Sequence, residues 1–219
     1  MTNILNHFDS HLFIKTFQHM QLSLYSLLIS IAIAVPLGIL LAKSKHPKMA
    51  AFILKMASIL QTIPGLALIA LIVSILVLIR KIIFLPATGF LPAIIVLSLY
   101  AILPILANTY YGIKEVNPTM VDVAKGMGMT SKQILFSVEL PLALRVIITG
   151  IRISLVWTIG MATLTSLVGS GGLGDLIMQG LRSMQIDLII AGTLPAAILA
   201  IFFDWLFAVL GKWLTYQPR

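Results

Sequence analysis

Long apolar runs without charge alternate with short polar segments along this chain. Residues 16–42, 56–79, 82–113 and 153–174 contain no Asp, Glu, Lys or Arg, and the run 188–211 contains only Asp204. About 20 residues of α-helix cross the hydrocarbon core of a bilayer, so each run is long enough for one span. The pattern predicts five membrane-spanning helices, near residues 18–42, 50–79, 90–113, 143–168 and 188–211.

The second predicted helix is long and contains Pro64-Gly65 near its centre. Proline removes one helical hydrogen bond and clashes with the preceding turn, so we expect a kink or a break there. A count of six helices, with 50–61 and 64–79 as separate elements, stays open.

Composition supports the same class of protein. The chain is 59% hydrophobic and 10% charged, whereas an ordinary soluble domain is about 45–50% apolar and about 25% charged. So few charges cannot cover a water-facing surface, so residues 1–219 are predicted to form one all-α polytopic domain surrounded by lipid. The net charge of +8 does not indicate nucleic acid, because no basic run is interleaved with aromatic residues.

Basic residues predict the orientation of the spans, since Lys and Arg accumulate in cytoplasmic loops. If the polar segment 114–142 is cytoplasmic, most basic residues outside the spans lie on its side. Those left on the external side are Lys15, Arg80, Lys81 and Arg182. This arrangement predicts an external N-terminus and a cytoplasmic C-terminus.

The segment 114–142 is the one long polar loop, and its turn chemistry predicts two short helices. Asn117 before Pro118 is typical of a helix start, and Gly126 and Gly128 can end that helix near Lys125. A second helix is predicted from a capping box that joins Thr130 to Gln133. Pro141 is expected to limit this second helix and lead into the next span.

The two predicted loop helices carry an apolar face. Its members are Val121, Met127, Met129, Ile134 and Phe136. An apolar face outside the bilayer should be buried against something. Either it packs on the chain's own transmembrane helices, or it is a docking surface for a cytoplasmic partner.

The loop also has the spacing of a known motif. It reads Asp122-Val123-Ala124, three residues, Gly128, nine residues, then Val138-Glu139-Leu140-Pro141. This resembles the E-A-A, Gly, I-x-L-P loop of permeases of binding-protein-dependent ABC importers, with Asp in place of Glu and Val in place of the first Ala. The segments LQTIPGLAL at 60–68, VELPLAL at 138–144 and LVGSGGLGD at 167–175 resemble the osmoprotectant branch of that family.

The resemblance implies a type I importer permease core in a bacterial plasma membrane. Its substrate would be a quaternary ammonium solute such as glycine betaine, carnitine or choline, moved by alternating access. Its partners would be two ABC ATPase subunits, a second permease chain of the same or similar kind, and an external substrate-binding protein. The helix near 118–126 would dock on the ATPase, and the coupling residues would be Asp122, Val123, Ala124, Lys125, Gly126, Met127, Gly128 and Pro141.

This chain is not expected to be an enzyme or to hold a cofactor. It has no Walker A sequence, so ATP and Mg²⁺ would be bound by the ATPase. The segment Gly169–Gly174 matches G-x-G-x-x-G, but a dinucleotide site needs a βαβ unit. We expect a flexible external turn between the last two spans, either a plain turn or a gate that touches the binding protein.

Two ionisable residues, Arg152 and Asp204, lie inside predicted spans at similar depths from the inner ends. Charges are costly in hydrocarbon and are usually paired or functional, so we predict that the two pair or meet water in a translocation cavity. The alternative is that each extends separately to the interface. Five polar or amphipathic residues near the middle of the membrane either join helices by hydrogen bonds or line the translocation path: Gln61, Thr62, Trp157, Thr163 and Ser166. Pro64 is a further candidate for the path.

Metal and catalytic sites are not expected. His7, His11, His19 and His46 have no zinc-type spacing and are predicted to lie at the membrane interface. Three other functions stay open: an ABC permease for another small solute such as an amino acid, an intramembrane enzyme, and an ion-coupled secondary carrier. The enzyme would need a catalytic set at matched depth, and the carrier would need a midplane ionisable residue but no ATPase.

Overall fold

The computed structural model describes residues 2–80 and 82–214, with side chains from residue 11 onward. Every regular element in these ranges is helical, as predicted. The α-helices are α1 (Thr2–Lys43), α2 (Pro47–Thr62), α3 (Gly65–Ile79), α4 (Phe90–Lys114), α5 (Pro118–Gly126), α6 (Ser131–Ile134), α7 (Leu140–Thr165), α8 (Gly174–Ser183) and α9 (Ile186–Leu214). A π-helical turn, η1 (Leu135–Glu139), precedes α7, and a 3-10 turn, η2 (Ser166–Val168), follows it.

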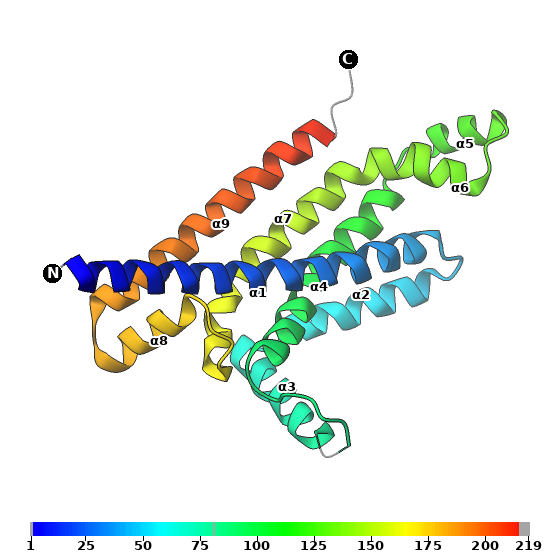
Figure 1. Cartoon of the computed structure of the whole chain (residues 1–219). Coiled ribbons are helices and arrows are strands. Elements are labelled where there is room, and N and C mark those ends of the chain that lie inside the picture. Colours follow the sequence, from blue (N-terminus) through cyan, green and yellow to red (C-terminus); the bar gives the residue numbers. More distant parts are fainter. Residues whose placement is uncertain (1, 81, 215–219) are drawn as a thin grey trace.

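The core of the bundle is formed by α1, α4 and α7, and α9 packs on α7 and α8 (Figure 1). Leu27 and Ala34 of α1 meet Ile105 and Leu106 of α4 and Leu155 of α7 in one buried cluster. The helices approach closely where a glycine faces a neighbour. An added Cβ at Gly150 of α7, for example, would lie 2.7 Å from the carbonyl oxygen of Pro104 in α4. Small residues at such crossings are typical of membrane helix packing.

Buried hydroxyl groups connect the same three helices. The Ser30 hydroxyl of α1 lies 3.0 Å from the carbonyl oxygen of Ser98 in α4. The Ser154 hydroxyl of α7 donates to the carbonyl oxygen of Ala101 in α4 at 2.7 Å. A hydroxyl with no water nearby must find such a partner, so these bonds fix the register of the helices.

The second predicted helix is broken where proline predicted it. Ile63 and Pro64 have extended backbones, and α2 and α3 meet at 103°. Proline disfavours the helical conformation of the residue before it, which ends α2 at Thr62. At ~1.5 Å per residue, the 15-residue α3 is only ~22 Å long, short of a ~30 Å hydrocarbon core. In the described chain, four helices are long and apolar enough to span a membrane, or five if the bent pair is one span.

The expectation that Pro141 limits the second loop helix is wrong. α6, η1 and α7 join into one helical segment over residues 131–168. Pro141 lies in the first turn of α7, directly after the π-turn. The wider π-turn changes the hydrogen-bond register just before the proline, and proline is well tolerated at the first helical position.

Other boundaries also differ from the predicted ranges. α1 begins at Thr2 instead of near residue 18, and the segment between the last two predicted spans contains the additional helix α8. The charge-free criterion misses α8 because its residues are amphipathic rather than uniformly apolar.

Candidate functional site

The loop between α4 and α7 has the local structure that its sequence predicts. The Asn117 side chain accepts a hydrogen bond from the Thr119 N–H at 2.9 Å, and Pro118 begins α5. Gly128 has a φ of 82°, a left-handed conformation that suits glycine. Gly126, by contrast, is the last helical residue of α5. Thr130 and Gln133 form the predicted capping box at the start of α6. We call residues 115–139 the elbow.

Most of the predicted coupling residues are accessible on the elbow. Val123 and Met127 are 58% and 77% exposed, whereas Ala124 is 3% exposed and faces its own chain. Asp122 pairs with Lys125 at 3.0 Å on the exposed side. Gly126, Gly128 and Pro141 are also exposed.

The apolar face of the elbow is divided between two environments. Ile134 is buried and Val121 and Met129 are half-buried, while Met127 and Phe136 are exposed. The first group is covered by the chain itself, and the second group is uncovered apolar surface. That a cytoplasmic partner docks on the uncovered part stays a prediction.

An ion pair fastens the base of the elbow to α1. Glu139, the last residue of the π-turn, is only 5% exposed and pairs with Lys43, the last residue of α1. Next to it, a cluster that includes Ala42, Ile113 and Ala143 joins α1, α4 and α7. Sequence reasoning missed this pair, since Glu139 appeared there only as part of the loop motif.

The predicted pair between Arg152 and Asp204 is present. The Arg152 Nη2 atom donates to both carboxylate oxygens of Asp204 at 2.9 Å, and Nε donates to Oδ1 at 3.1 Å. This forked geometry joins α7 to α9 and satisfies both charges without water. The two side chains are 32% and 43% exposed, so the pair lies at the edge of the bundle.

The six residues suggested for the translocation path do not converge on one cavity. Gln61 donates to the carbonyl oxygen of Tyr100 at 2.9 Å and lines a cavity of ≈ 380 Å³ between α2 and α4. Ser166 lines a different cavity beside α8. Thr163 bonds its hydroxyl to the Gly160 carbonyl oxygen, Thr62 bonds to Ile59, Pro64 precedes α3, and Trp157 is 62% exposed on α7.

The glycine segment after η2 is held against α1 and α7. Gly169, Gly171 and Gly172 all have positive φ. The Gly172 N–H donates to the Gln18 side chain of α1 at 3.1 Å. An added Cβ at Gly174 would overlap the carbonyl oxygen of Thr163 in α7. The turn is therefore packed against both helices. Its expected flexibility, and the role of a gate that touches a binding protein, stay predictions.

The prediction that the histidines lie at the interface is wrong for His19. This side chain is fully buried in the described structure, and its Nε2 atom lies 3.0 Å from the Ile159 carbonyl oxygen of α7. His11 and His46 are exposed, and the side chain of His7 lies outside the described residues. The described residues contain no cluster of three or more His, Cys, Asp or Glu that could hold a metal.

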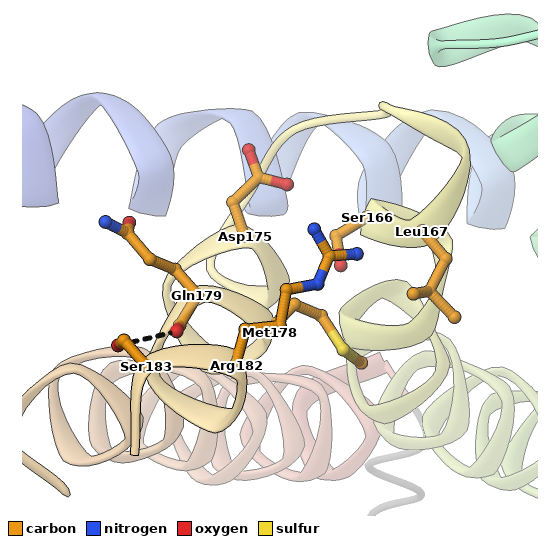
Figure 2. A pocket seen from close by; sticks show the side chains of 7 residues that line it. All are labelled: Ser166, Leu167, Asp175, Met178, Gln179, Arg182 and Ser183. Atoms are coloured by element: carbon orange, nitrogen blue, oxygen red, sulfur yellow. Dashed lines mark hydrogen bonds between the residues drawn. The ribbon is translucent and has the colours of Figure 1, made fainter. Parts of the chain in front are cut away.

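A cavity of ≈ 390 Å³ lies between η2 and one face of α8 (Figure 2). Its lining residues are Ser166, Leu167, Asp175, Met178, Gln179, Arg182 and Ser183. Asp175 pairs with Lys15 of α1, which places the start of α8 against the first helix. We call this cavity the α8 pocket. It lies at the end of α7 opposite to the elbow (Figure 1).

The bundle, with its apolar spans and an exposed elbow between two of them, defines a polytopic membrane protein of the permease class. Residues 34–216 match the family described as the binding-protein-dependent transport system inner membrane component. The chain belongs to this family, and it is a translocation subunit rather than an enzyme.

Relatives and a solved structure agree with this assignment. The chain is 44% identical over 202 residues to the carnitine transport permease protein OpuCB of Listeria monocytogenes, covering 92% of this chain and 86% of the relative. It is 43% identical to the choline transport system permease protein OpuBB of Bacillus subtilis (strain 168), covering 92% and 87%. The fold is similar to a chain of the inward-facing MetNI methionine ABC transporter, with a TM-score of 0.81, 21% identity, and coverage of 94% and 97%.

Proposed function

We propose that this chain is the permease subunit of an ATP-driven importer for a quaternary ammonium osmoprotectant, such as glycine betaine, carnitine or choline. The observation that carries the substrate class is the 44% and 43% identity to a carnitine permease and a choline permease over most of both chains. The ≈ 21% identity to a methionine transporter supports the fold alone and gives no reason to prefer an amino acid.

In the proposed mechanism, the elbow is the contact with a separate ATPase. Val123, Met127 and Phe136 are uncovered apolar side chains on an otherwise polar loop, which is the surface that a protein partner would bury. ATP binding would move the elbow, and the bundle would switch between inward-open and outward-open states. The α6, η1 and α7 segment is a continuous helical lever for that movement.

The proposed assembly contains two permease chains, two ATPase subunits and one external binding protein. One elbow serves one ATPase subunit, and closure of an ATPase pair needs two elbows. The proposed orientation has the elbow in the cytoplasm and the glycine segment outside, with an external N-terminus. The excess of basic residues on the elbow side supports this orientation.

The test is transport by the reconstituted complex. The chain, its ATPase and its binding protein are placed in lipid vesicles with ATP on the elbow side, and uptake of labelled glycine betaine, carnitine and choline is measured. The expected result is uptake that requires both ATP and the ATPase. Uptake that persists without the ATPase would favour an ion-coupled carrier, and uptake of labelled amino acids alone would refute the substrate class.

A matched variant links the transport result to the elbow. Met127→Glu places a charge in the uncovered apolar surface, whereas Lys132→Glu changes a charge on the exposed polar side of the same elbow. Met127→Glu should abolish co-purification of the ATPase, because a charge would have to be desolvated at the contact. Equal co-purification by wild type and Met127→Glu would contradict the docking role.

A further inference from the structure

The α8 pocket has charged groups that no feature of the coupling mechanism uses. Asp175, Met178 and Arg182 follow one another at helical spacing, so they share one face of α8. All three line the cavity. Figure 2 shows the Met178 and Arg182 side chains extending toward Ser166 and Leu167, and the Asp175 carboxylate directed toward α1. One wall therefore offers charges, and the other offers a hydroxyl and an aliphatic side chain.

The two charges in the pocket differ in how they are satisfied. The Asp175 Oδ2 atom contacts the Lys15 ammonium group of α1, and the Asp175 side chain is 32% exposed. Arg182 is exposed and has no ion-pair partner in the part of the chain that the structure describes. The pocket thus contains a partly neutralised carboxylate and an unpaired guanidinium, with a net positive charge when Lys15 is counted.

An unpaired guanidinium in a concave site fits a carboxylate. Its fork of N–H donors matches the two oxygens of a carboxylate, and no lysine provides that geometry. The cavity of ≈ 390 Å³ falls in the size range of small-molecule sites, roughly 300–1,000 Å³. A quaternary ammonium group has no N–H to donate, so it needs only a diffuse negative charge and apolar contact. Asp175, Met178 and Leu167 can provide these.

We propose that the α8 pocket is a transient site for zwitterionic solutes, in which Arg182 binds the carboxylate and Asp175 faces the cationic end. This inference rests on the proposed function, because it names the part of the solute that the permease itself recognises. Partial exposure screens both charges and keeps the site weak. A weak site suits a solute that must leave again, and it would favour glycine betaine or carnitine over choline, which has no carboxylate.

The test compares two solutes in two variants of the reconstituted complex. Arg182→Gln removes the guanidinium from the pocket. Arg80→Gln is the matched control, because Arg80 is also exposed and lies after α3, stacked on Phe84 at 5.6 Å. ATP-dependent uptake of labelled glycine betaine and choline is measured at saturating binding protein. Arg182→Gln should lower the glycine betaine rate about 3- to 10-fold without lowering the choline rate, because choline has no carboxylate for the guanidinium to bind. Arg80→Gln should lower neither rate.

Three results would overturn the inference: an equal loss for both solutes, no loss for either, or a wild type that carries choline but no glycine betaine. Weaker docking of the binding protein to Arg182→Gln would also overturn it, since the arginine would then contact that protein. If wild type carries only glycine betaine, the inference is supported when Arg182→Gln still docks the binding protein and loses rate while Arg80→Gln does not. Should wild type carry neither solute, the proposed function fails. Calorimetric titration of glycine betaine into the purified wild-type and Arg182→Gln complexes then tests the pocket separately: weaker binding to the variant supports the inference, and equal binding or none overturns it.

A second variant guards against misfolding. Arg182→Lys keeps the charge on the same exposed helix face but removes the fork, so it should recover part of the glycine betaine rate. Both variants are checked by size-exclusion chromatography. If Arg182→Lys and Arg182→Gln elute aggregated and have equally low rates, the loss comes from misfolding and the inference is overturned. An Arg182→Lys rate equal to wild type would show that fork geometry is not used.

Discussion

The close crossing of α4 and α7 at Gly150 can be tested by adding one methyl group. In Gly150→Ala, the new Cβ would lie 2.7 Å from the Asn108 Cβ atom and 2.7 Å from the Pro104 carbonyl oxygen, whereas ordinary contact begins near 3.4 Å. The helices must therefore separate by about 0.7 Å at this point. Overpacking of this kind costs about 1–3 kcal/mol, which lowers Tm by roughly 2–12 °C for a chain of this size.

Gly160→Ala is the control, because it makes the same change on the same helix where an added Cβ meets nothing within 4 Å. Replacing glycine by alanine within a helix stabilises by about 0.5–1 kcal/mol, so this variant should melt at or above the wild-type temperature. Thermal unfolding of the purified protein in detergent, followed by size-exclusion chromatography, measures both. Equal melting temperatures for the two variants would refute the claim that backbone contact at Gly150 sets the α4–α7 distance.

Three further predictions concern the elbow and the orientation of the chain. Lys43→Glu or Glu139→Lys should each destabilise by about 1–3 kcal/mol, because a nearly buried charge loses its partner, and the double exchange should recover part of the Tm; no recovery would mean that the ion pair is not what matters. Gly128→Val should reduce ATPase co-purification, since a β-branched residue resists the positive φ of 82°; unchanged co-purification would contradict this. A single cysteine at Gly126 should react with an impermeant reagent only from the cytoplasm and one at Ile82, 87% exposed, only from outside, and the reverse pattern would overturn the orientation.

Features that depend on neighbouring residues could be predicted from the sequence. The start of α5, the left-handed Gly128 and the capping box at Thr130 follow from side chains within three residues of the backbone groups that they serve. The spans follow from the absence of charge over about 20 residues. The break at Pro64 has the same local origin, because a proline constrains itself and the residue before it.

Features that depend on distant pairing were mostly missed. Lys15 and Asp175 are 160 positions apart, and nothing in either local sequence names the other. Arg152 and Asp204 were paired correctly because each stands out in a charge-poor run, at a depth that limits the choice of partner. His19 was misplaced because the space for it is created by Gly172, where an added Cβ would lie 3.2 Å from the histidine Nδ1 atom.

α7 connects the two candidate sites, and this arrangement determines how their variants should differ. The helical segment 131–168 begins in the elbow and ends beside the α8 pocket. Between these ends, Gly150 sets its distance to α4 and Arg152 fastens it to α9. Because helical hydrogen bonds run along the whole segment, a displacement of the elbow reaches Ser166 without crossing an extended joint. Variants at the elbow should therefore abolish transport of every solute, and variants of the α8 pocket should change only which solute is carried. Variants of the α7 crossings should lower stability and transport together.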